Sequence, residues 1–190
     1  MKKILRIVIT GMVFAMLLLL AGAAAVTAQD GEAVTGYTNV RLWVYPEHDH
    51  PQDYGLPPDP LLLVMMEGQI TGAEPPAEVR FLVPDTAVMY SAGSMDINGQ
   101  YTGGPPDRET SEVAGWDLVS YEVTTETFRV EYYAPIIQSL PDKTISYDFH
   151  TLVPVTDLNV IVQTPLGASN FNVSPEGTPI KEGQFNSFSY

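Results

Sequence analysis

The sequence predicts an all-β protein, an antiparallel β-sandwich that is immunoglobulin-like (Ig-like) in the broad sense and follows an N-terminal signal peptide. Three observations predict this class. After the first 28 positions, apolar residues recur every second residue, as in half-buried strands, and never with the period of a helix. The apolar runs are rich in β-branched and aromatic residues and are bounded by Pro, Gly, Asn or Asp. Strand starts recur at roughly 10–15 residues, which is typical of stacked antiparallel sheets.

Residues 1–28 have the composition of a secretory signal peptide. A basic start at Lys2, Lys3 and Arg6 precedes an apolar run over residues 7–26, and small residues then precede a cleavage site ahead of Gln29. The alternative is an uncleaved membrane anchor, because about 20 apolar residues can span a bilayer. The alanine-rich end of the run favours cleavage. We therefore expect a bacterial exported protein, extracellular or in the cell envelope.

The remaining residues 29–190 are expected to form one β-sandwich domain. The chain has no cysteine, so neither a disulfide nor a lipid-modified cysteine is expected. With 23 acidic against 9 basic residues, its net charge is −14. This charge repels phosphate backbones and anionic headgroups and excludes nucleic-acid binding. Membrane association is expected only through an uncleaved signal or through a C-terminal anchor beyond this sequence.

The strands are expected to alternate with short turns. Asn98-Gly99 predicts a two-residue hairpin with both residues at positive φ. Residues 46–60, with five prolines, and residues 103–113 are expected to be loops, the second of them mobile. The expected strands are 40–45, 61–66, 78–83, 87–97, 100–102, 116–123, 127–134, 144–153, 158–163, 169–173 and 184–190.

The last residues are aromatic but do not follow a single strand face. A two-residue period leaves at least one of Phe185, Phe188 and Tyr190 pointing outward. An outward aromatic side chain at a chain end is typical of a surface that packs against a partner. Residues 183–190 are therefore expected to be the start of a second module that is missing from this sequence.

Several strand sequences resemble those of an uncharacterised group of bacterial exported proteins, many of them membrane-anchored. The segments that carry the resemblance are LLLVMMEGQI, AEVRFLVP, FRVEYYAP, KTISYDF and VIVQTP…NFNVSP, within residues 40–174. The resemblance implies an Ig-like or carboxypeptidase-regulatory-like β-sandwich after a signal peptide, with a C-terminal membrane helix in many members. It implies no catalytic residue, because the shared motifs are those of core strands.

Two of the three histidines lie in a polar cluster that could bind a metal ion. His48 and His50 project on the same side of an extended backbone and could share Zn²⁺ or Cu²⁺, with His150 as a third ligand if it lies nearby. The alternative is a solvated loop, because strong zinc motifs contain a second matched pair. Residues 96–99 begin like a calcium loop but lack the acid that completes an EF-hand. No cofactor is therefore expected, with Ca²⁺ or Zn²⁺ as the alternative.

Aromatic and charged side chains are expected to share the outward side of one strand. If residues 40, 42 and 44 face the core, Arg41, Trp43 and Tyr45 line the opposite face, and Tyr133 likewise points away from the core. Sugars and peptides stack on stripes of this kind. The alternative is that the proline-rich loop or a missing domain covers the stripe.

The sequence contains few of the motifs that enzymes need. It has no cysteine nucleophile, no G-x-S-x-G and no S-x-x-K. Two acids at glycosidase spacing cannot be recognised among 23. We therefore expect a non-catalytic cell-envelope module for adhesion, assembly or display, with a protein or glycan at the cell surface as its partner. The alternatives are a carbohydrate- or peptide-binding domain that uses the aromatic face and a metal-dependent site at His48 and His50.

Overall fold

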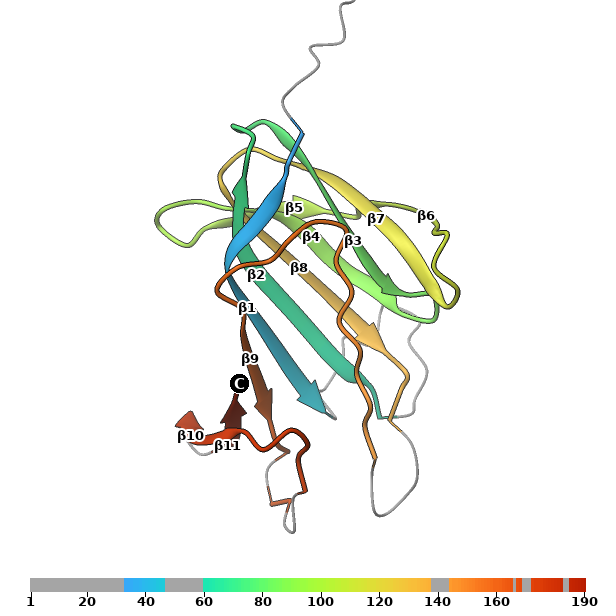
Figure 1. Cartoon of the computed structure of the whole chain (residues 1–190), viewed down its shortest axis with the longest axis vertical. Coiled ribbons are helices and arrows are strands. Elements are labelled where there is room, and N and C mark those ends of the chain that lie inside the picture. Colours follow the sequence, from blue (N-terminus) through green and yellow to red (C-terminus); the bar gives the residue numbers. More distant parts are fainter. Residues whose placement is uncertain (1–32, 47–59, 138–143, 166, 169–171, 183–184) are drawn as a thin grey trace, which may run out of the picture. The chain divides into compact units, whose positions relative to one another are not determined.

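The computed structural model describes residues 33–46, 60–137, 144–165, 167–168, 172–182 and 185–190. These residues contain eleven strands and no helix, and so no helix among them could cross a membrane (Figure 1). The strands are β1 (Gly36–Pro46), β2 (Leu62–Thr71), β3 (Ala77–Pro84), β4 (Val88–Met95), β5 (Tyr101–Gly104), β6 (Asp107–Thr110), β7 (Trp116–Val123), β8 (Thr127–Ala134), β9 (Asn159–Gln163), β10 (Thr178–Glu182) and β11 (Phe185–Ser189).

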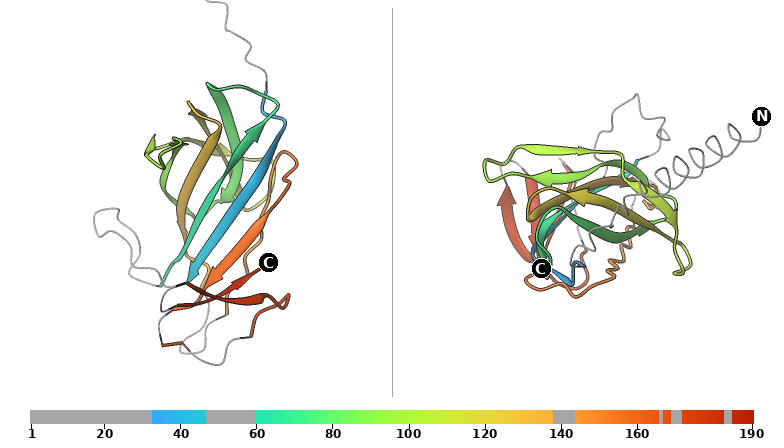
Figure 2. Two further views of the ribbon diagram at one scale, coloured as in Figure 1. Left: turned by 90° about the vertical axis from the view of Figure 1, so that its left-hand side faces the viewer. Right: turned by 90° about the horizontal axis from the view of Figure 1, so that it is seen from above.

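The strands form two sheets, which confirms the predicted β-sandwich. The large sheet has eight strands in the order β10-β11-β9-β1-β2-β8-β4-β5, and the small sheet has the order β3-β7-β6. Neighbouring strands are antiparallel except for β1 and β9, which run parallel. Figure 2 shows β9, β1 and β2 lying side by side, with β10 and β11 at one end of the sheet.

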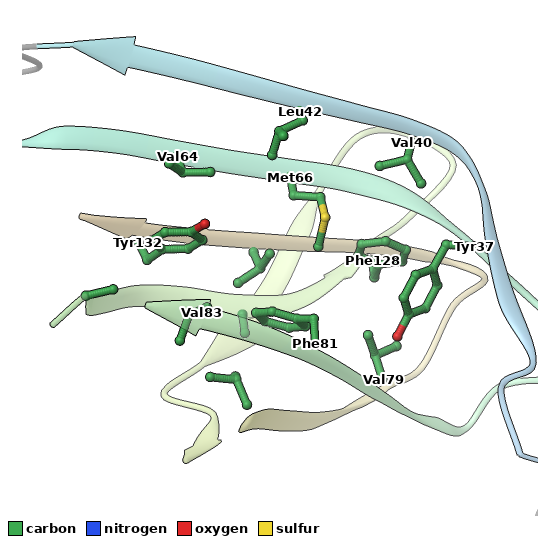
Figure 3. Packing of buried hydrophobic residues seen from close by; sticks show 14 of the residues in the cluster. Tyr37, Val40, Leu42, Val64, Met66, Val79, Phe81, Val83, Phe128 and Tyr132 are labelled. Carbon is green, nitrogen blue, oxygen red and sulfur yellow. The ribbon is translucent and has the colours of Figure 1, made fainter. Parts of the chain in front are cut away.

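The core lies between the inner face of the large sheet and the small sheet. The sequence pattern predicts its composition correctly, because alternate residues of each strand are buried, as in Val40, Leu42 and Val44 of β1. The side chains of the two layers interdigitate in Figure 3. The fully buried members include Leu62, Val64, Val79, Val83, Val119, Val123, Phe128 and Val130.

Residues 144–156 cover part of the core without forming the predicted strand. Ile145, Tyr147 and Phe149 pack against the core and alternate with more exposed residues, as the sequence predicts. The segment nevertheless makes only isolated bridges, one of them between Tyr37 and Val155. Alternation therefore reports one-sided burial correctly, but it does not show that the backbone joins a hydrogen-bonded ladder.

The β4–β5 hairpin forms as predicted, but its turn is longer. Met95 pairs with Tyr101, and the N–H of Asp96 donates to the carbonyl of Gln100 (3.0 Å), so that three residues form the tip. Of the tip residues only Gly99 has positive φ (77°), and the prediction for Asn98 is wrong. The Asp96 carboxylate explains this geometry, because it accepts the N–H groups of Asn98 (2.8 Å) and Gln100 (2.7 Å).

Replacing Gly99 by valine should destabilise the chain by roughly 1–2 kcal/mol, because a β-branched residue resists positive φ. Gly104 is a matched control, since a Cβ meets open space at both positions and only Gly99 has positive φ. Gly104→Val should therefore change the free energy of unfolding much less, as measured by urea denaturation. Equal losses in the two variants would contradict the role given to the backbone conformation.

Residues 103–113 are not the loop that the sequence predicts, because they include the end of β5 and the whole of β6. All four side chains of β6 are exposed, so no apolar pattern indicates this strand. Arg108 holds β6 in place. Its guanidinium pairs with Asp117 of β7 at 2.7 Å and donates to the carbonyls of Ala87 (2.6 Å) and Asp85 (2.8 Å).

A tyrosine connects the two sheets through the core. Tyr37 of β1 is 2 % exposed, and its ring lies against Phe128. Its hydroxyl donates to the carbonyl of Arg80 in β3 (2.6 Å) and accepts the N–H of the same residue (3.2 Å). Burial raises the pKa of this phenol to about 12.

The C-terminal strand β11 is paired within the large sheet. It runs antiparallel to β10 and to β9, where Phe188 lies opposite Val162. Its Ser187 side chain is buried. That residues 183–190 are the start of a second module stays a prediction from the sequence.

Candidate functional site

A polar pocket lies on the outer face of the large sheet, which we define as the face that points away from the small sheet. The pocket has a volume of about 480 Å³ and lies where β1, β2 and the start of β9 meet. Carboxylates, amides, one guanidinium and one hydroxyl supply its polar groups, so that it offers both donors and acceptors. The lining residues are Asn39, Val40, Arg41, Glu67, Gly68, Gln69, Thr127, Asp157 and Asn159.

A β-bulge in β1 shapes one wall of the pocket. Thr38 pairs with Gln69 and Arg41 with Glu67, so two residues of β1 lie opposite one residue of β2. The first of them, Asn39, has positive φ (51°), a conformation that asparagine tolerates better than most residues. The bulge lets the Asn39 side chain reach Gln69, where its Nδ2 donates to Oε1 at 2.8 Å.

The neighbouring strand has a matching irregularity. Asp157, just before β9, also has positive φ (54°), and its Oδ2 accepts a hydrogen bond from the Thr38 hydroxyl at 3.2 Å. Asn39 and Asp157 are the non-glycine residues of positive φ in the part of the chain that is described, and both line the pocket. Such conformations cost about 1–3 kcal/mol each and cluster at functional sites, which favours this pocket as a binding site.

The predicted aromatic stripe begins beside the pocket. Arg41, Trp43 and Tyr45 all lie on the outer face of β1, as predicted, because the residues between them are buried in the core. Arg41 lines the pocket and Trp43 is the next outward residue, partly exposed and opposite Met65 of β2. Arg41 and Trp43 therefore form one continuous surface with the pocket.

The other end of the stripe is packed more closely. Tyr133 points away from the main core as predicted, yet it is only 5 % exposed. It forms a small cluster with Leu61 and Leu63, against which Tyr45 and Tyr90 pack. Tyr45 and Tyr133 thus contribute much less accessible ring surface than the sequence pattern suggests.

The middle of the outer face contains an ion pair that the sequence analysis missed. Arg129 and Glu131 of β8 lie 2.7 Å apart, and the Arg129 Nη2 also contacts the sulfur of Met65 at 2.7 Å. The Arg129 Nε is buried and has no hydrogen-bond partner among the described residues. The alternation of Arg and Glu with apolar residues in β8 indicates that one side of this strand is charged. Only the order of the strands in the sheet shows that this charged side lies near Trp43.

Tyr101 of β5 lies at the far side of this ion pair. Gly103 leaves room for it, because a side chain at Gly103 would collide with the Tyr101 hydroxyl. That hydroxyl lies near Ser91, Glu131 and Arg129, but it makes no hydrogen bond of good geometry within the described chain. Burial raises the pKa of the phenol, with a smaller opposing effect from Ser91.

The structure brings no metal-binding cluster together among the residues it describes. His150 lies against Trp116, with ring centroids 4.4 Å apart. His48 and His50 lie outside the described residues, so the shared metal site stays a prediction. The Asp96 carboxylate closes the β4–β5 turn, and the backbone N–H of Gln100 holds its pKa below the ordinary value.

No protein-family model matches this chain, and no curated protein matches it. Among solved structures, an M1 zinc metallopeptidase from Deinococcus radiodurans is similar at 17 % identity, over 85 % of this chain and 39 % of that one. The TM-score is 0.36 for this enzyme and 0.39 for a point mutant of it. The chain thus spans about two fifths of the metallopeptidase chain, and a likeness this low supports no inference about function.

Proposed function

We propose that this chain is a non-catalytic binding module of the bacterial cell envelope that binds a surface glycan on the outer face of its large sheet. The observation that carries the proposal is the polar pocket between Asn39 and Asp157, with Trp43 beside it. We infer export from residues 1–28, which have the composition of a signal peptide. We also propose that the chain belongs to the group of exported β-sandwich proteins that its strand sequences resemble.

The chemistry of the pocket favours a neutral, hydroxyl-rich ligand. A sugar hydroxyl both donates and accepts hydrogen bonds, and the pocket supplies acceptors from Glu67 and Asp157 as well as donors from Arg41. Trp43 adds a partly exposed ring on which a sugar can stack. The net charge of −14 disfavours strongly anionic ligands.

Binding should be measured by calorimetry on the purified protein with cellohexaose, chitohexaose and xylohexaose as probes. We expect at least one probe to bind and Trp43→Ala to weaken its affinity at least tenfold, because the stacking surface is lost. Asn39→Gly should also weaken binding, since glycine keeps the positive φ but removes the amide from the pocket.

Thr102→Ala is the control, because Thr102 is exposed on β5 and its neighbour Tyr101 takes the outward position. The control should bind as the unaltered protein does. The proposal would be wrong if none of the three probes bound, or if binding survived both Trp43→Ala and Asn39→Gly. Binding of an unstructured peptide library in place of the sugars would favour the peptide-binding alternative.

A further inference from the structure

We propose that the ligand of the outer face is an extended, uncharged oligosaccharide that lies across the strands, from the pocket beside β1 to Tyr101 on β5. This inference rests on the proposed function and specifies the shape of the ligand. It assigns a second binding position, at Tyr101, to a part of the sheet that the sequence analysis did not single out.

The charges between the two positions are balanced. In the strand registers Arg41 lies opposite Glu67, and Glu67 lies opposite Arg129, which pairs with Glu131. Two guanidinium groups and two carboxylates therefore cross the centre of the face with no net charge. A charged polymer would meet repulsion at half of these groups, whereas hydroxyl groups can donate to the carboxylates and accept from the guanidinium groups.

The far end of the face has polar atoms without partners. The Tyr101 hydroxyl and the Arg129 Nε are buried and lack hydrogen-bond partners among the described residues. Gly93 lies opposite both Arg129 and Gly103, and the Tyr101 side chain lies over Gly103, where it takes the place that a side chain of that residue would occupy. The partly exposed ring of Tyr101 therefore covers this end of the face and offers a second flat surface on which a sugar can stack.

The distance across the face sets the size of the ligand. From β1 to β5 there are four strand spacings, through β2, β8 and β4. At about 4.8 Å each they amount to roughly 19 Å, which exceeds the length of a disaccharide. A peptide fits this surface less well, because peptides bind sheets chiefly through the free backbone groups of an edge strand. The strands β1, β2, β8 and β4 are paired on both sides, and of the strands crossed by this surface the short β5 alone lies at the edge of the sheet.

The test is a chain-length series of the sugar that binds, from the disaccharide to the hexasaccharide, titrated into the unaltered protein and four single variants of it. Trp43→Ala should weaken every length about equally. Tyr101→Ala should weaken the hexasaccharide about tenfold and leave the disaccharide unchanged, because only long ligands reach β5. Tyr101→Phe, which keeps the ring and removes only the buried hydroxyl, should bind the hexasaccharide nearly as tightly as the unaltered protein does.

The possible outcomes separate this inference from the proposed function. If no sugar binds the unaltered protein, the proposed function fails and the inference fails with it. If sugars bind and Tyr101→Ala has the same effect, or none, at every length, the proposed function stands and the extended ligand is wrong. An affinity that rises with chain length, lost in Tyr101→Ala but kept in Thr102→Ala, would support the inference.

Discussion

Raising the pH from 8 to 11 should lower the free energy of unfolding by a few kcal/mol, a large part of the stability of a typical domain. Four tyrosines that lie in the core or pack against it cause this loss. Burial raises the pKa of Tyr37 and of Tyr147 to about 12, and it raises the pKa values of Tyr121 and Tyr132 well above 10. The hydroxyls of Tyr132 and Tyr147 also share a hydrogen bond of 2.6 Å.

The direction follows from proton binding. Below pH 10 these phenols are protonated in both the folded and the unfolded chain, so they do not make stability depend on pH. Between pH 10 and pH 12 the unfolded chain loses these protons while the folded chain keeps them. The unfolded state then binds fewer protons, and the free energy of unfolding falls as the pH rises. At pH 11 Tyr37 and Tyr147, with pKa values of about 12, each contribute a loss of roughly 1–2 kcal/mol, and Tyr121 and Tyr132 act in the same direction.

Urea denaturation followed by circular dichroism at several pH values would measure this loss. Tyr121→Phe is the matched variant, because the Tyr121 hydroxyl makes only a long hydrogen bond of 3.5 Å to the Arg129 carbonyl. The free energy of unfolding of this variant at pH 8 should change little. Above pH 10 it should fall less steeply with pH than that of the unaltered chain, because one tyrosine fewer releases its proton on unfolding. A chain equally stable at pH 8 and pH 11 would contradict the burial of these phenols.

Phe128→Ala should destabilise the chain by about 3–5 kcal/mol, the range for truncating a fully buried aromatic residue. Phe128 is completely buried, and its ring lies 4.9 Å from that of Tyr37. It also lies opposite Gly68 of β2 and fills the space that a side chain there would occupy, since a Cβ at Gly68 would come within 2.9 Å of the ring. Figure 3 shows this ring between β2 and Tyr37.

A double-mutant cycle would test this packing directly. Gly68→Ala should destabilise the unaltered chain by overpacking, and it should cost less in the Phe128→Ala background, because the space beside it is then empty. Equilibrium unfolding in urea gives all four free energies. Strictly additive effects, or a loss below about 1 kcal/mol for Phe128→Ala, would show that the ring does not pack against Gly68 as described.

The fold class and most strands could be predicted because burial on one side of a strand leaves a period of two in the sequence. The strands β7 and β8 have the predicted bounds, 116–123 and 127–134. The strand β6 could not be predicted, because all four of its side chains are exposed and Arg108 holds it through contacts distant in sequence. Residues 144–153 show the opposite error, since they alternate correctly but do not join a sheet.

The candidate site could be predicted only in part. The outward positions of Arg41, Trp43 and Tyr133 follow from alternation alone. The pocket does not, because it depends on the positive φ of Asn39 and Asp157, which come from different segments and meet only through the parallel pairing of β1 with β9. Local sequence patterns do not encode which distant strand becomes a neighbour.

The bond between Tyr37 and Arg80 has a consequence for the behaviour of the chain in concentrated solution. The strand β3 is an outer strand of the small sheet, and its unpaired N–H and C=O groups could template the addition of a strand from another molecule, the first step of edge-to-edge aggregation. At Arg80 both backbone groups are already occupied by the Tyr37 hydroxyl. The tyrosine that joins the two sheets therefore also interrupts the row of unpaired backbone groups of β3 at mid-strand, where a strand from another molecule would have to pair.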